Sequence, residues 1–146
     1  MNNIDDFYMG EALKEARKAF DNDEIPVGAV ICCGDKIIAR AHNSTECLHD
    51  VTAHAEMIAI TAATNTIGGK YLNDCTLYVT LEPCIMCAGA LAWAQIGHIV
   101  YGASDPKHGF TTIQQNILHP KTTVKSGIMS NEAAQLLKLF FESKRV

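Results

Sequence analysis

The sequence predicts a three-layer α/β fold in which a mixed five-stranded sheet carries helices on both faces. Three observations lead to this fold class. Segments rich in strand-forming residues alternate with segments of helical periodicity along most of the chain. A Gly-Asp pair at residues 34–35 separates two adjacent strand-like segments. The length of 146 residues is typical of one domain with its own core, so we expect a single domain spanning residues 1–146.

The first third of the chain predicts a helix followed by a hairpin. Apolar residues recur every three or four positions in the first segment, as in an amphipathic helix, and an acidic linker at residues 22–24 follows it. The next two segments flank the Gly-Asp turn and should pair in antiparallel fashion. The expected bounds are 4–21 for the helix and 25–33 and 36–42 for the strands.

The middle of the chain predicts a loop, a second helix, a strand and a third helix. Residues 43–51 are polar and without periodicity, as in a loop, and the second helix should open at Thr52 or Ala53 and end near Gly68. Residues 75–81 form a strand-like run. Pro83 then suits the first turn of a helix that reaches about Ala94. Because this third helix is apolar on nearly every side, we expect it to be buried within the domain or in a subunit interface.

The last part of the chain predicts two more strands and a final helix. The strand at residues 98–102 should lie parallel to the one at 75–81, since a helix connects them. A long loop at 104–120 and a short strand at 122–126 precede a helix at 131–144. We expect Phe140 and Phe141 to pack this helix onto the core.

Composition places the chain among ordinary globular proteins. Apolar residues make up 48% and charged residues 19%, which argues against long disordered segments. The longest apolar run, residues 84–94, is too short to span a bilayer, which needs about 20 residues. The N-terminus has neither a basic leader nor an apolar signal core, so a cytoplasmic protein without a membrane partner is expected.

Six cysteines in such a chain indicate free thiols or metal ligands rather than a disulfide framework. Only Cys84 and Cys87 have the spacing of metal ligands. We interpret Cys32, Cys33 and Cys75 as apolar filler of strands.

Two short motifs carry the chemistry. His54 and Glu56 stand two residues apart, and Pro83 precedes a Cys84-x-x-Cys87 pair. Together they form the His-x-Glu and Pro-Cys-x-x-Cys signature of zinc-dependent nucleobase deaminases. Two cysteines on one helix face and a histidine from a second helix give three zinc ligands. A fourth position left open is typical of a catalytic zinc, so we expect one Zn²⁺ per chain with catalytic function.

Glu56 is better placed for proton transfer than for binding the metal. One carboxylate can take the proton of a water molecule and then pass protons to a ring nitrogen and to the departing ammonia. A non-enzymatic alternative also fits the motifs. Cys47 or His49 could supply a fourth zinc ligand, and the zinc would then be structural, as in an interaction module.

The chain closely resembles the bacterial tRNA wobble-position adenosine deaminases of the cytidine deaminase-like superfamily. The resemblance rests on residues 25–30, 76–90, 96–97 and 100–103, and on Asn43, His49, Asp50, Asp105, Lys107, Gly109, Phe140 and Phe141.

The resemblance implies a mechanism and a set of site residues. Zinc would be bound by His54, Cys84 and Cys87, and zinc-bound hydroxide would attack C6 of adenosine with Glu56 as proton shuttle. Asn43 would hydrogen-bond the flipped base. The resemblance further implies a homodimer whose site for the tRNA anticodon loop draws on both subunits and which forms inosine at the wobble position.

The charge distribution allows an anionic partner on the C-terminal side. Residues 1–106 carry 6 basic and 14 acidic side chains, whereas residues 107–146 carry 6 basic and 2 acidic ones. We expect the basic side chains of this segment to meet the backbone of tRNA, and DNA is not an expected partner. They are Lys107, Lys121, Lys125, Lys138, Lys144 and Arg145.

Several features depart from the family pattern and keep a second substrate class open. Val51 stands where the family often has proline, Glu46 and Leu48 stand where it often has basic residues, and the isoelectric point is near 5.8. A deaminase of a free nucleobase, guanine or cytosine, shares the zinc motifs and is the leading alternative to a tRNA enzyme.

Overall fold

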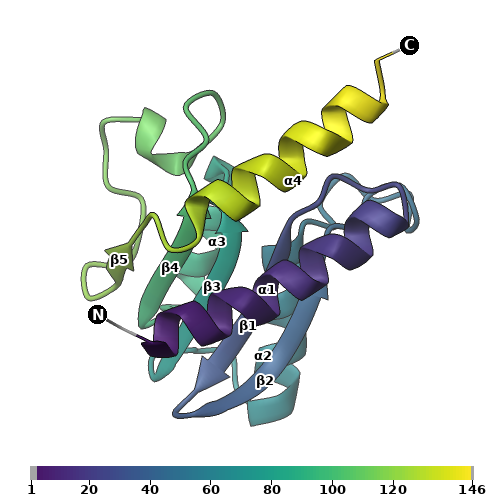
Figure 1. The fold of residues 1–146 in the computed structure, drawn as a ribbon. Helices are drawn as coiled ribbons and strands as arrows, with labels where there is room; N and C mark the ends of the chain where they lie inside the picture. Colours follow the sequence, from purple (N-terminus) through teal and green to yellow (C-terminus); the bar gives the residue numbers. More distant parts are fainter. Residues whose placement is uncertain (1–2, 146) are drawn as a thin grey trace.

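A single mixed sheet organises the chain in this computed structural model, which describes residues 3–145 (Figure 1). Its strand order is β2-β1-β3-β4-β5, with β1 antiparallel to both β2 and β3, while β3, β4 and β5 run parallel. The strands are β1 Gly28–Cys33, β2 Lys36–His42, β3 Cys75–Leu81, β4 His98–Ala103 and β5 Thr123–Lys125. The predicted mixed five-stranded sheet is confirmed. Residues 1, 2 and 146 of the predicted domain lie outside the described residues.

Helices cover both faces of the sheet, which confirms the three layers. Helices α1 and α4 lie on one face and α2 and α3 on the other (Figure 1). The helices are α1 Asn3–Asp21, α2 Ala55–Ile67, α3 Ile85–Trp93 and α4 Ser130–Ser143, and a short 3₁₀ turn spans Phe110–Thr112. Among the described residues, no helix combines the length and the apolar character needed to cross a bilayer.

The central strands are buried on both faces, which explains their nearly continuous apolar sequence. In β1, Ala29 and Ile31 join the core under α2 and α3, whereas Val30 and Cys32 pack toward α1. This follows from the period of two residues in a strand. Both faces of β1 therefore need apolar side chains.

Two predicted boundaries are wrong by two or three residues. Strand β1 begins at Gly28 rather than at residue 25, since the ladder with β2 starts only there. Helix α2 begins at Ala55 rather than at Thr52 or Ala53, because Asp50 holds the preceding residues in a turn. Its carboxylate accepts hydrogen bonds from the Thr52 N–H (2.8 Å) and hydroxyl (2.7 Å), and its carbonyl accepts one from the Ala53 N–H.

Pro83 also lies outside the helix that it was expected to open. The N-cap of α3 is Cys84, in extended conformation with φ −71° and ψ 172°, so Pro83 precedes the cap. A residue before the cap lies outside the helical turn, where a proline leaves no helical hydrogen bond unmade. The shift places a cysteine, rather than a proline, at the start of α3.

Helix α3 is only half buried, although its apolar sequence predicts burial all round. Its inner side packs Cys87, Ala88 and Leu91 into the core. Trp93 on the outer side is 86% exposed in the single chain, and Ile85 is also exposed. Burial within the domain is therefore confined to the inner side of this helix.

Helix α1 packs directly on the backbone of β1 at Gly28. A Cβ atom there would lie 2.0 Å from the Ala12 carbonyl oxygen and 2.4 Å from the Ala16 nitrogen, both of which are backbone atoms. We predict that Gly28→Ala lowers the free energy of unfolding by about 3 kcal/mol, because overpacking forces the helix off the sheet. Urea denaturation measures the change.

A glycine within the same helix provides the matched control. A Cβ at Gly10 meets no atom within 4 Å, so Gly10→Ala should raise stability by about 0.5–1 kcal/mol through its helix propensity. A Gly28→Ala protein as stable as the unmodified chain would contradict the close packing of α1 on β1.

Candidate metal centre

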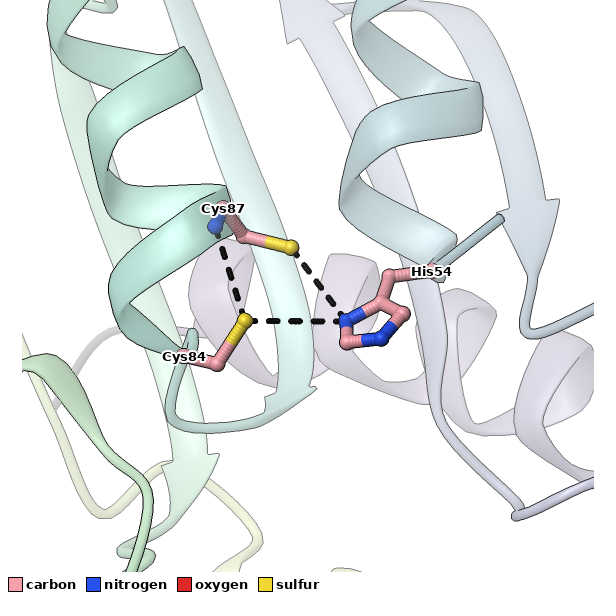
Figure 2. A group of neighbouring side chains, drawn as sticks. All are labelled: His54, Cys84 and Cys87. Carbon is pink, nitrogen blue, oxygen red and sulfur yellow. Dashed lines mark hydrogen bonds between the residues drawn. The ribbon is translucent and has the colours of Figure 1, made fainter. Parts of the chain in front are cut away.

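Three side chains of the two sequence motifs meet between the starts of two helices. His54 is the N-cap residue of α2, Cys84 is the N-cap residue of α3, and Cys87 follows in the first turn of α3. Figure 2 shows both sulfurs directed at the imidazole. His54 Nδ1 lies 3.6 Å from Cys84 Sγ and 3.5 Å from Cys87 Sγ. The structure thus brings together the three residues that the sequence proposes as zinc ligands.

Local backbone geometry explains how one turn presents both cysteines. The extended conformation of Cys84 directs its Sγ back toward the first turn of α3, where it accepts a hydrogen bond from the Cys87 N–H at 3.5 Å. Unpaired N–H groups at a helix start carry partial positive charge and stabilise a thiolate. The pair is thus arranged to hold negative charge before any cation binds.

The thiols polarise one another strongly in the absence of a cation. Hydrogen bonds from the Cys87 thiol and from His54 lower the pKa of Cys84 to about 4, against the opposing effect of burial. The neighbouring Cys84 sulfur and burial raise the pKa of Cys87. The hydrogen bond to Cys84 raises the pKa of His54. A positive charge placed between the sulfurs would relieve this conflict by stabilising both as thiolates.

The donor set fits a tetrahedral zinc ion. Typical Zn–S and Zn–N distances of about 2.3 Å and 2.05 Å at a tetrahedral angle separate sulfur from nitrogen by about 3.6 Å. The observed separations of 3.6 and 3.5 Å match this value. Two thiolates and one imidazole are also a typical ligand set for catalytic zinc.

No fourth protein ligand completes the group within residues 3–145. The cluster of candidate metal donors contains only His54, Cys84 and Cys87. Cys47 is exposed, with its N–H bonded to the Glu24 carboxylate, and His49 stands in a left-handed turn at φ 51°. The structure therefore gives no support to a closed structural site that includes Cys47 or His49.

Glu56 lies beside the three donors, in the first turn of α2. Its side chain is 4% exposed and lies close to the Cys87 thiol. Burial raises the pKa of Glu56 to about 7. A carboxyl group in such a position can both accept and release a proton near neutral pH.

Asn43 is placed next to the same helix start. It follows β2, is buried, and its Oδ1 accepts a hydrogen bond from the Ala55 N–H at 2.8 Å. Ala55 lies between His54 and Glu56 in the chain, so Asn43 is held beside both. This bond also satisfies the first free N–H of α2.

Two buried carboxylates near the site were missed from the sequence. Glu24 was assigned to an acidic linker, yet it is 2% exposed and accepts hydrogen bonds from the N–H groups of Glu46 and Cys47. Glu82 is 3% exposed and binds residues Asp105 and Thr111. The position of Glu82 in the sequence, between a buried strand and the Pro-Cys motif, could have indicated that its side chain is buried near the site.

Comparisons with known proteins agree with this geometry. The family described as the cytidine and deoxycytidylate deaminase zinc-binding region matches residues 2–103. The tRNA-specific adenosine deaminase of Agrobacterium fabrum is 44% identical over 95% of both chains. The enzyme of the same name from Aquifex aeolicus is 46% identical over 96% of this chain and 95% of its own.

A solved structure from work on A-to-I editing by tRNA:A34 deaminases shares the fold. It has a TM-score of 0.84 and 43% identity, and covers 89% of this chain and 98% of its own. The cofactor of this deaminase family is Zn²⁺, and His54, Cys84 and Cys87 form a group of the right composition to hold it. The chain therefore belongs to the family of tRNA-specific adenosine deaminases, within the wider group of zinc-dependent cytidine and deoxycytidylate deaminases.

Proposed function

We propose that this chain deaminates adenosine to inosine at the wobble position of tRNA. The observation that carries the chemistry is the group of three zinc donors, of which His54 and Cys84 are only partly buried, with the buried Glu56 beside it. The names of the relatives, tRNA-specific adenosine deaminases, support the substrate. The net reaction adds water at C6 of adenine, releases ammonia and leaves a carbonyl.

His54, Cys84 and Cys87 are the proposed ligands of the zinc. When bound, zinc lowers the pKa of a water molecule and so supplies a nucleophile near neutral pH. The three side chains fix the position of the ion between two helix starts. Because the ligands come from N-cap and first-turn positions, their backbone directions are set by the helices and not by flexible loops.

Glu56 is the proposed proton shuttle. Its carboxylate accepts one proton from the attacking water and passes it to a purine ring nitrogen. It then accepts the proton left on the C6 hydroxyl and passes it to the departing ammonia. Its burial beside Cys87 keeps bulk water from competing for these protons. Its place two residues after His54 holds it close to the ion without making it a ligand.

Asn43 is the proposed contact to the base. Its Oδ1 is fixed by the Ala55 N–H, and Nδ2 has no partner among the described residues. Since no buried side-chain nitrogen in that part of the chain lacks a partner, Nδ2 is accessible to solvent. It is free to donate a hydrogen bond to an acceptor on the base.

An anticodon loop suits this site because its bases are already unstacked and cost little to extract.

Only part of the basic C-terminal segment is free to meet the RNA backbone. Lys125 donates to Asp5 at 2.6 Å, and Lys144 pairs with Asp23. Lys107, Lys121 and Lys138 form no ion pair within residues 3–145 and are the better candidates for phosphate contacts.

The test of substrate compares RNA with free bases. We predict inosine formation in an arginine tRNA with an adenosine at the wobble position, and no ammonia release from guanine, adenine or cytosine. Nucleoside analysis by mass spectrometry and an ammonia assay measure the two activities. Leu48 and Val51 are exposed and stand where the family often has basic residues or proline. Because this departure weakens the case for tRNA, guanine is the most informative free base to compare with it. Activity confined to a free base would refute the tRNA assignment.

Substitutions at the site separate the metal role from the proton role. We predict that Glu56→Ala retains one zinc per chain but loses turnover by about 10²–10⁴-fold, because the proton shuttle is gone. Cys87→Ser should instead lower bound zinc below one per chain. Metal analysis and single-turnover kinetics give the two readouts.

Glu46→Ala is the control for a carboxylate near the site. Glu46 is exposed and contributes its backbone N–H to the loop, so its side-chain loss should change neither zinc nor turnover. Wild-type turnover in Glu56→Ala would remove Glu56 from the mechanism.

We further propose that the protein is a cytoplasmic homodimer joined through the outer side of α3. Trp93 is 86% exposed, and Ile85 and Met86 are exposed on the same helix. Large apolar side chains gathered on one surface are typical of protein interfaces. A second copy would cover them close to Cys84 and Cys87, which begin the same helix.

Trp93→Glu should therefore convert a dimer into a monomer at micromolar concentration, because an interfacial carboxylate would lose its hydration. Sedimentation equilibrium measures the mass. Phe7→Glu, which alters an exposed apolar residue of α1 on the other face of the sheet, should leave the dimer intact. A Trp93→Glu protein that remains dimeric would place the interface elsewhere.

A further inference from the structure

Glu82 is a buried carboxylate whose hydrogen bonds all reach one loop. It follows β3 directly and is 3% exposed. Its Oε1 accepts from the Asp105 N–H at 3.0 Å, and its Oε2 accepts from the Thr111 N–H at 2.9 Å and from the Thr111 hydroxyl at 2.7 Å. Within residues 3–145 it forms no ion pair. These three donors are therefore what compensates the buried charge.

The loop held by Glu82, residues 105–111, lies against the start of α3. The Phe110 N–H donates to the Pro83 carbonyl at 2.9 Å, and Gly109 forms a backbone bridge with Cys84. A Cβ on Gly109 would lie 2.1 Å from Glu82 Oε2, so only glycine allows this approach. The loop is thus fixed to the residue that begins the metal site.

Further contacts make this loop a defined structure on its own. The Asp105 carboxylate accepts hydrogen bonds from the N–H groups of Lys107 and His108. Phe110 is buried against Tyr101 with the rings edge to face. Loss of Glu82 would release the two ends of the loop while Phe110 still anchors it, so the fold should survive.

We propose that Glu82 is a positioning residue for deamination, which holds residues 105–111 against Cys84 as one wall of the space that orients the base. The inference rests on the proposed function for the identity of the base. The proposed phosphate contacts at Lys121 and Lys138 lie outside this loop and should change little when the wall loosens. Orientation of the base toward the attacking water should suffer, and misplacement by about 1 Å costs up to about 10²-fold in rate.

The test uses Glu82→Gln, which preserves size but replaces one acceptor oxygen with an NH₂ donor. We expect amide hydrogen exchange at Asp105 and Thr111 to quicken about tenfold or more, with one zinc per chain retained. On a tRNA anticodon stem-loop, kcat should fall about tenfold or more while KM changes less than about threefold. Thr111→Val removes only the hydrogen bond from the hydroxyl to Glu82. It should also lower kcat with little change in KM, but by a smaller factor than Glu82→Gln.

Asp5→Asn is the matched control for a buried carboxylate. Asp5 is 4% exposed and accepts hydrogen bonds from Tyr78 and Lys125 on the opposite face of the sheet, so its loss should leave kcat unchanged. An unchanged kcat in Glu82→Gln, an equal loss in Asp5→Asn, or unchanged exchange at Asp105 and Thr111 would overturn the proposal.

The two levels of the proposal fail in different ways. If the unmodified protein acts on guanine and not on tRNA, the substrate assignment fails. The role of Glu82 is then tested on guanine. Faster hydrogen exchange at Asp105 and Thr111 and a lower kcat on guanine in Glu82→Gln would support it, and no change in either would overturn it.

Discussion

The site depends on two helix starts that lie side by side on one face of the sheet. Helix α2 places His54 at its N-cap, and α3 places Cys84 at its N-cap with Cys87 in its first turn (Figure 2). Sulfur and nitrogen come within 3.6 Å, the spacing that a tetrahedral zinc needs. Because the ligands lie at helix N-termini, the partial positive charge there stabilises thiolates and developing negative charge.

Two buried carboxylates give shape to the segments around these helix starts. Glu24 binds the loop that precedes His54, and Glu82 binds the loop beside Cys84. Each replaces the water that would otherwise solvate free backbone N–H groups. Segments without regular secondary structure are thereby held in one arrangement.

The sheet, its order of elements and the three metal donors were predictable from the sequence because each has a strict local pattern. Strands that are buried on both faces have nearly continuous apolar sequences. Zinc is bound by few residue types, and these occur at few spacings along the sequence. The start of α2 was placed too early because a turn held by the Asp50 side chain leaves no mark in periodicity. Glu24 and Glu82 were missed since an acidic residue beside a loop looks solvated until its N–H partners are known. The outer side of α3, with Trp93, is exposed in the single chain although its sequence is apolar.

The most direct test of the account is X-ray absorption at the zinc edge of the purified protein. The account predicts two sulfur neighbours at about 2.3 Å, one imidazole nitrogen at about 2.05 Å and one light atom from solvent. A third sulfur or a second imidazole would show that another side chain, such as Cys47 or His49, closes the site. The zinc would then be structural, and the deaminase chemistry assigned to this centre would be wrong.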